Sequence, residues 1–170
     1  MNKKIPLLGF AAFSGTGKTT LLTQLIPLLK AKDLRVGVIK HSHHNFEIDH
    51  EGKDSFRLRE AGATPMVLVS KYRRVIIEEL ENHIEPTLEE QIALFNPNKT
   101  DLILVEGFRD AAISKIELHR AELNKPFLHL NDSHIIAIAS DVELNTNLPQ
   151  LNLNKPVEIA DFILHTFLKS

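Results

Sequence analysis

The chain has 170 residues, of which 43% are hydrophobic and 25% are charged, and its formal net charge at pH 7 is -2. This size and composition predict a single folded domain over residues 1–170 with a sizeable core. The nearly balanced charge argues against nucleic acid or an anionic membrane surface as a partner, and no apolar run is long enough to span a bilayer. Cysteine is absent, which excludes disulfides and thiolate metal sites and is consistent with a reducing cytoplasm.

The first predicted element is a strand over residues 5–13, because this short apolar run is typical of a parallel strand buried on both faces. The basic residues before it also suggest a secretion signal, but the glycine-rich turn that follows favours the strand. Leucines at helical spacing then predict a helix over residues 18–32, with a kink at Pro27.

The rest of the chain alternates between strand and helix patterns. Further strands are predicted over residues 35–41, 101–108, 114–120, 134–140 and 149–154, and helices over residues 54–63, 85–95 and 156–169. The runs at residues 64–70 and 74–80 flank a short connection and predict a β-hairpin or an extension of a sheet edge. The alternation predicts an α/β fold, with a mostly parallel sheet between helices on both faces.

The segment "AAFSGTGKTT", residues 11–20, follows the phosphate-loop pattern G-x-x-x-x-G-K-[ST], except that Ala12 stands at the first glycine. A small side chain suffices at the start of the turn, and the segment lies between a strand and a helix, as a phosphate nest requires. The residues expected to bind nucleotide are Ser14, Gly15, Thr16, Gly17, Lys18, Thr19 and Thr20. Lys18 is expected to contact the β- and γ-phosphates as a catalytic group and Thr19 to ligate Mg²⁺. The alternative is a turn that only caps a core helix. The loop makes the predicted fold a three-layer sandwich of the P-loop NTPase type.

A Mg·nucleotide site also needs a carboxylate, and Glu106 is the candidate because it ends a predicted strand. Asp101 starts the same strand, about 16 Å away, at the edge where ligands do not gather. Gly107 is expected to let the backbone approach the γ-phosphate. The alternative for Glu106 is a strand-end charge that faces solvent.

Two features bear on which nucleotide base the protein recognises. The run "NKTD", residues 98–101, spells the guanine-reading motif of many GTPases, but it precedes its strand and is interpreted as a loop. Asp141 follows a predicted strand at the correct edge, and its carboxylate could accept hydrogen bonds from guanine N1 and N2.

A polar loop, "SHHNFEIDHEGKDS", follows the strand that ends near Lys40. Such a loop can sense the γ-phosphate, with Lys40 offsetting phosphate charge and Asp49 or Asp54 orienting water or Mg²⁺ as catalytic groups. The histidines there are His41, His43, His44 and His50. Imidazole suits Zn²⁺ or Ni²⁺, but the spacing matches no compact metal site, so a surface for a second ligand or partner and a solvated loop both stay open.

Taken in order, "SGTGKTTLL", "KHSHH", "GKDSFRLREAGA", "DLILVEGF" and "AIASDV" resemble the MobB family, the adapter proteins of molybdopterin-guanine dinucleotide biosynthesis, over essentially the whole chain. The resemblance implies a dimeric GTP-binding protein of the P-loop class that hydrolyses GTP weakly. It also implies that the protein functions together with the guanylyltransferase that joins GMP to molybdopterin.

The resemblance assigns Lys40, Asp54 and Ser55 to a segment like a switch, besides the loop residues and the Glu106–Gly107 pair. The chain departs from the expected pattern at Ser42, where threonine is expected, and at Glu51, where proline is expected. The first departure keeps a hydroxyl group, and the second puts the rigidity of the loop in doubt.

Two alternatives to an adapter stay open. One is a small-molecule kinase on the same fold, because positioning and charge stabilisation suffice for phosphoryl transfer. The other is a GTPase metallochaperone that carries its metal on the histidine loop. For a homodimer, the apolar runs "MVLVS" and "RVIIEEL" are the first candidates, since unpaired strand edges invite pairing. Molybdopterin itself is a possible ligand.

Overall fold

The structure is a computed structural model that describes residues 4–42, 44–80 and 84–169. The chain forms two compact units, one of residues 1–41 and 88–170 and the other of residues 42–87. The first contains a six-stranded sheet and the second a two-stranded sheet. That both units form one nucleotide-binding domain stays a prediction.

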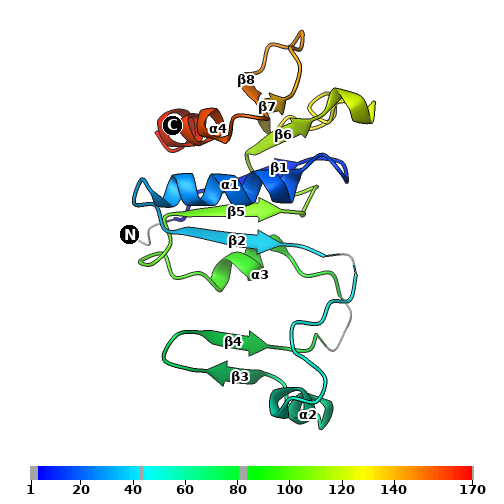
Figure 1. Cartoon of the computed structure of the whole chain (residues 1–170), viewed down its shortest axis with the longest axis vertical. Helices are drawn as coiled ribbons and strands as arrows, with labels where there is room; N and C mark the ends of the chain where they lie inside the picture. The colour runs from blue at the N-terminus through cyan, green and yellow to red at the C-terminus, as the bar shows by residue number, and fades with distance from the viewer. Residues whose placement is uncertain (1–3, 43, 81–83, 170) are drawn as a thin grey trace. The chain divides into compact units, whose positions relative to one another are not determined.

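The sheet of the first unit is parallel throughout, in the order β2-β5-β1-β6-β7-β8 (Figure 1). Its strands in chain order are β1 (Leu7–Ala11), β2 (Val36–Lys40), β5 (Leu102–Glu106), β6 (Lys115–His119), β7 (Ile135–Ser140) and β8 (Gln150–Asn152). Because all strands run the same way, their carboxyl ends share one edge. The predicted parallel sheet is therefore confirmed.

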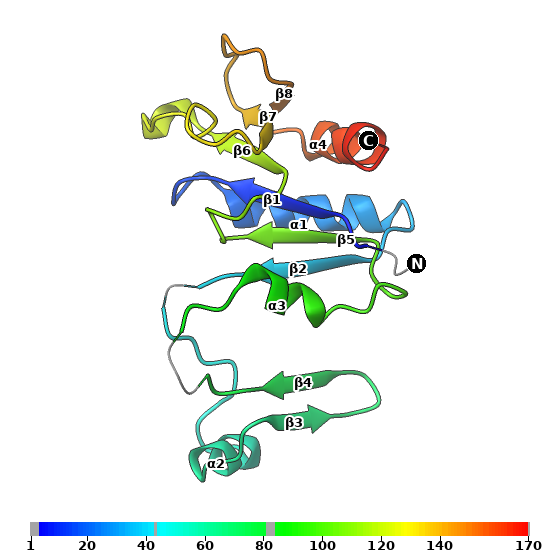
Figure 2. The same cartoon turned by 180° about the vertical axis from the view of Figure 1, so that it is seen from behind.

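Helices cover both faces of this sheet. The helices of the first unit are α1 (Lys18–Lys30), α3 (Leu88–Ala93) and α4 (Pro156–Phe162), with a 3-10 helix, η1 (Ala121–Leu123), and a π-helix, η2 (Ile163–Phe167), that directly follows α4. α1 and α4 pack on one face, and α3 lies on the other (Figures 1 and 2). This confirms the predicted three-layer arrangement, and α1 continues through Pro27 to Lys30. None of the described helices has the length and apolar character needed to cross a membrane.

Alternating side chains of the central strands fill two separate cores. In β5, Leu102 and Leu104 face the core shared with α1, whereas Ile103 and Val105 pack with Leu88 of α3. These four side chains of β5 are fully buried. Burial on both faces explains why these strands are continuous apolar runs in the sequence.

One face of β6 is polar although it is buried. Lys115 and Glu117 are only 3% and 1% exposed. Glu117 accepts hydrogen bonds from the backbone N–H groups of Leu128, at 2.7 Å, and His129, at 2.9 Å, and its carboxylate lies 2.8 Å from His129 Nδ1. Lys115 Nζ donates to Asp132 at 2.8 Å. Buried charges therefore fasten the segment 121–134 to this strand.

The second unit contains α2 (Asp54–Glu60) and the strands β3 (Met66–Val69) and β4 (Arg74–Ile77). β3 and β4 pair antiparallel and form a sheet of their own, so the hairpin is confirmed and the edge extension is not. α2 ends before Gly62, whose φ is +101° and whose N–H donates to the Arg59 carbonyl at 2.7 Å. A glycine is suited to this left-handed position.

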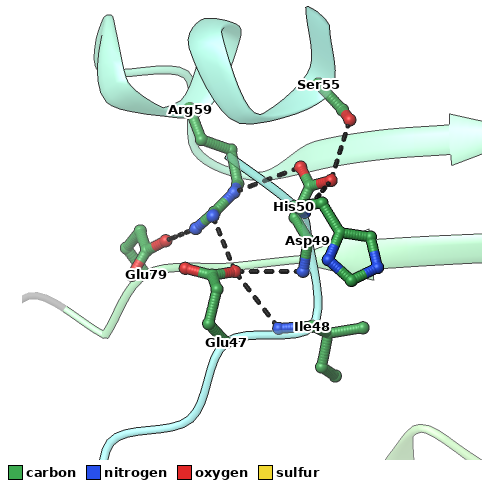
Figure 3. Close-up of polar contacts among 7 residues, drawn as sticks. All are labelled: Glu47, Ile48, Asp49, His50, Ser55, Arg59 and Glu79. Carbon is green, nitrogen blue, oxygen red and sulfur yellow. Dashed lines mark hydrogen bonds and ion pairs between the residues drawn. The ribbon is translucent and has the colours of Figure 1, made fainter. Parts of the chain in front are cut away.

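Arg59 is the centre of the second unit's polar contacts (Figure 3). Its side chain is 7% exposed, and its guanidinium donates to Glu47 at 2.8 Å and Glu79 at 2.7 Å. Asp49 lies 3.8 Å from Arg59 Nε and also accepts from Ser55 at 3.0 Å. The hydrogen bond from Arg59 lowers the pKa of Glu47. One arginine thus joins the polar loop, α2 and the segment after β4.

Replacing Arg59 with Gln is expected to loosen residues 44–60, because three carboxylates then lose their shared cation. Hydrogen exchange of peptides from this segment should become faster. Arg57→Gln is the matched control, because Arg57 is 76% exposed and its nearest carboxylate, Asp54, is 4.0 Å away. Equal exchange in both variants would contradict the role given to Arg59.

Replacing Glu117 with Gln is expected to lower the free energy of unfolding by about 1–3 kcal/mol, because an amide cannot accept all the hydrogen bonds that the buried carboxylate accepts. Urea unfolding measures the change. Glu122→Gln, on the exposed turn η1, should change stability little. A loss of equal size in both variants would show that Glu117 has no special anchoring role.

Candidate functional site

The phosphate loop joins β1 to α1 by a turn that only glycine adopts readily. Gly15 has a φ of +82° and Gly17 a φ of +93°, both in the left-handed region. Gly17 is the N-cap of α1, which has no side-chain cap and no acidic residue in its first turn. The first N–H groups of the helix have no partner within it. The loop therefore presents an uncompensated positive end, suited to an anion.

Contacts from within the loop and from β6 fix its shape. Thr16 is 2% exposed, and its hydroxyl donates to the Phe13 carbonyl at 2.8 Å. Arg120, directly after β6, donates from Nε to the Thr16 carbonyl at 3.0 Å. Arg120 was not among the site residues predicted from the sequence. Its position as the last residue of the strand predicted over residues 114–120 was the available signal.

Lys18 is a half-buried amine beside the loop. Desolvation lowers its pKa, the carboxylate of Glu106 opposes this effect, and the charges of Lys40 and Arg109 add to it. The ammonium donates to the Ala12 carbonyl at a long 3.4 Å. A positive charge that is desolvated and crowded by other cations favours a bound anion nearby.

Glu106 lies at the same sheet edge as the phosphate loop, since it pairs with Phe10 of β1 and with Lys40 of β2. Its side chain is 14% exposed, and Lys40 Nζ lies 3.3 Å away. The fold itself requires a glycine at position 107, because its φ is +93° and a Cβ there would lie 2.6 Å from the His41 Cβ. The role of Gly107 toward a phosphate stays a prediction.

The "NKTD" run lies at the opposite end of β5. Asp101 precedes this strand and accepts hydrogen bonds from Arg35, at 3.0 Å from the backbone N–H and 2.7 Å from Nε. The carboxylate joins the start of β5 to the residue before β2. The structure thus agrees with its interpretation as a loop rather than a base-reading motif.

Asp141 follows β7 and contacts the phosphate loop through a neighbour. It accepts from the Ala121 N–H at 3.0 Å and lies 3.6 Å from the Arg120 guanidinium. Arg120 also lines a cavity of about 210 Å³, together with Gly17, Thr20, Leu21, Gln24, Leu153, Asn154 and Pro156. The base-reading role of Asp141 stays a prediction.

The two other predicted catalytic carboxylates belong to the second unit. Asp49 is 12% exposed and is part of the Arg59 cluster, whereas the side chain of Asp54 is 97% exposed. Of the four histidines, His41 belongs to the first unit, His44 and His50 belong to the second, and His43 lies outside the described residues. In the described part of the chain no three His, Asp or Glu side chains are grouped to hold a metal ion. The zinc or nickel hypothesis stays a prediction.

Comparisons with known proteins agree on one family. Residues 7–141 match the family model described as "MobB: Molybdopterin guanine dinucleotide synthesis protein B". The chain is 45% identical to the molybdopterin-guanine dinucleotide biosynthesis adapter protein of Haemophilus influenzae, over 98% of this chain and 94% of the relative. It is also 45% identical to that of Escherichia coli, over 97% and 95% of the two chains.

Solved structures show the same fold. A crystal structure of molybdopterin-guanine biosynthesis protein B superposes with a TM-score of 0.76 at 25% identity, covering 96% of this chain and 99% of the other. A Bacillus subtilis MobB structure gives 0.71 at 22% identity, covering 94% and 96%. The family model and the full-length relatives confirm the resemblance drawn from the sequence motifs, and the chain belongs to the MobB family of molybdopterin guanine dinucleotide synthesis proteins.

Proposed function

We propose that this protein is a GTP-binding adapter of molybdopterin-guanine dinucleotide biosynthesis, which binds Mg·GTP and hydrolyses it weakly. The observation that carries this proposal is the desolvated Lys18, which lies beside the glycine turn at the N-terminus of α1, a helix without a side-chain cap or an acidic residue in its first turn. A triphosphate supplies the negative charge that this arrangement lacks. The curated relatives named as adapter proteins of this pathway support the role.

The donor set fits the phosphates of a nucleotide. Gly15 and Gly17 turn the backbone so that the amides of residues 14–20 can donate to phosphate oxygens, and Lys18 would contact the β- and γ-phosphates. Arg120 holds the carbonyl of Thr16 and so keeps the loop in shape before a ligand arrives. Such preorganisation lowers the cost of binding.

The same edge offers oxygen ligands for Mg²⁺. Thr19 is exposed at the start of α1, and Glu106 ends the strand beside the loop. Hydroxyl and carboxylate oxygens suit this cation, which usually keeps several waters. Lys40, 3.3 Å from Glu106, would then offset phosphate charge. Mg²⁺ bound here would neutralise the phosphates as charge develops on them.

Weak hydrolysis follows from where the candidate bases lie. Within its own unit, the Asp49 carboxylate accepts a hydrogen bond from Ser55 and lies 3.8 Å from Arg59 Nε. A carboxylate with these partners is less available to orient a water molecule. Asp54 is almost fully exposed. Both residues stay predicted catalytic groups, and we propose that an adapter needs binding more than turnover. Guanine preference would come from the cavity beside Arg120 and from Asp141.

We further propose that the adapter works in the cytoplasm with the guanylyltransferase that joins GMP to molybdopterin. There it would present the nucleotide, or the pterin, to that enzyme. The names of the relatives support the assignment to this pathway, and the absence of cysteine is consistent with a reducing compartment. The cluster around Arg59 fixes the loop that would respond to the nucleotide or meet the partner.

Titration of Mg·GTP and Mg·ATP by calorimetry tests the nucleotide site. The wild type is expected to bind GTP more tightly than ATP. Lys18→Ala is expected to weaken GTP binding at least about tenfold, because charge-assisted hydrogen bonds to the phosphates are lost. The thermal midpoint of the free protein should change little, since burial desolvates the charge of Lys18 and its hydrogen bond to the Ala12 carbonyl is long, at 3.4 Å.

The matched control for this titration is Lys32→Ala, an exposed lysine beyond the end of α1. It should bind Mg·GTP as the wild type does. Undiminished GTP affinity in Lys18→Ala would contradict the phosphate site. Equal affinity for GTP and ATP in the wild type would contradict guanine selection while leaving the phosphate site in place.

The hairpin of the second unit supports the proposal of a homodimer. Val67 of β3 pairs with Ile76 of β4, and these side chains are 51% and 60% exposed. Leu68, which faces the other side of the hairpin, is 53% exposed. An isolated two-stranded sheet is marginal in water, and large exposed apolar patches mark interaction sites. A second copy of the chain would cover this surface.

Ile76→Asp is therefore expected to convert the dimer into a monomer, because a charge at the interface cannot be desolvated without a partner. Sedimentation equilibrium measures the mass, and far-ultraviolet circular dichroism checks that the variant is folded. Leu94→Asp is the control, as Leu94 is 80% exposed on the first unit. A wild type that is monomeric at high concentration, or an Ile76→Asp dimer, would contradict this interface.

A further inference from the structure

A cavity in the first unit, separate from the one beside Arg120, is not used by the nucleotide site described above. Its volume is about 440 Å³, within the range of small-molecule sites. It is lined by Ala11, Arg109, Asp110, Lys115, Leu128, Asn131, Asp132 and His134. These residues come from the end of β1, the connection from β5 to β6, the start of β6 and the segment that Glu117 anchors. We call it the Asp110 pocket.

The pocket adjoins the phosphate loop. Ala11 ends β1, and the loop follows it directly. The guanidinium carbon of Arg109 lies 5.3 Å from the centre of the Phe13 ring, within the loop itself. Arg109 is also close enough to Lys18 to lower its pKa, although desolvation is the larger cause. Ala11 lies at the carboxyl end of β1, the edge at which ligands of open parallel sheets gather, whereas Lys115 begins β6 and His134 precedes β7.

The charges of the pocket indicate what kind of ligand it takes. Lys115 is paired with Asp132, which also lies 3.2 Å from His134 Nδ1. Among the described residues, neither Arg109 nor Asp110 makes an ion pair. Arg109 and Lys115 are thus balanced by the carboxylates of Asp110 and Asp132, so neither a free phosphate nor a metal ion is favoured. A neutral, polar ring that both donates and accepts hydrogen bonds fits this balance.

We propose that the Asp110 pocket binds a 2-amino-4-oxopyrimidine ring, the group that guanine and pterins share. The two oxygens of Asp110 accept from the adjacent amino and ring N–H groups, the pairing that makes a carboxylate selective for this edge. Arg109 or the amide of Asn131 donates to the ring carbonyl, and Leu128 contacts the ring face. The inference deepens the proposed adapter function and rests on it, because both rings belong to the dinucleotide named in the family description.

Fluorescence titration of neopterin, with guanosine and adenosine as competitors, tests the pocket in the full-length protein. The wild type is expected to bind neopterin saturably. Asp110→Asn should weaken this binding at least about tenfold, because one acceptor becomes a donor that faces the ring N–H groups. Asp161→Asn, an exposed carboxylate on α4, is the matched control and should bind as the wild type does.

Competition separates the two sources of the ring. Displacement of neopterin by guanosine but not by adenosine supports a site for the shared ring, and no displacement by either supports a pterin site. Absence of saturable binding, displacement by adenosine, or equal affinity in Asp110→Asn would overturn the proposal. Lys18→Ala keeps neopterin binding and loses Mg·GTP binding if both proposals hold. Loss of neopterin binding in that variant would place the ring at the phosphate loop and overturn the pocket alone.

Discussion

The parallel pairing of β5 with both β1 and β2 is the constraint on which the rest of the structure depends. It brings the end of β1, Lys40 and Glu106 to one edge of the sheet, although they are far apart in the sequence. The pairing also forces the backbone of residue 107 against His41, which only a glycine permits. The closeness of Glu106 and Lys40 to the end of β1, where the phosphate loop begins, is therefore a consequence of strand register.

The buried and half-buried cations of this molecule differ in whether a carboxylate lies at hydrogen-bond distance from them. Arg59 and Lys115 have carboxylate partners at hydrogen-bond distance, and each holds a segment in place. Among the described residues no carboxylate lies at ion-pair distance from Lys18, and burial and the charges of Lys40 and Arg109 lower its pKa, which Glu106 partly offsets. A cation paired at short distance stabilises the fold, whereas one without such a partner can also pair with a ligand. This contrast supports the proposal that Lys18 contacts the phosphates.

The division of the chain into two units fits a protein that binds a small molecule and also meets other proteins. The first unit has the two cores and the phosphate loop, and its polar β6 face supports the Asp110 pocket. The second unit has few buried apolar residues, so its order depends on polar contacts around Arg59, and its hairpin exposes large apolar side chains. Such a surface gains stability from a partner, which agrees with the proposed adapter role.

The sequence by itself determined the order of the elements, the parallel sheet and the glycine-rich turn of the phosphate loop, but it left residues 64–80 open between a hairpin and a sheet-edge extension. These features are local, because apolar period, glycine position and strand length are read within about ten residues. The sequence also placed Glu106 and Asp101 at opposite edges, since that follows from strand direction alone. Only the tertiary structure decided that Arg120 holds the loop, that Asp49 is tied to Arg59, and that Asp110 lines a pocket. Those contacts join segments distant in the sequence, and side-chain packing selects them among many residues of the same type.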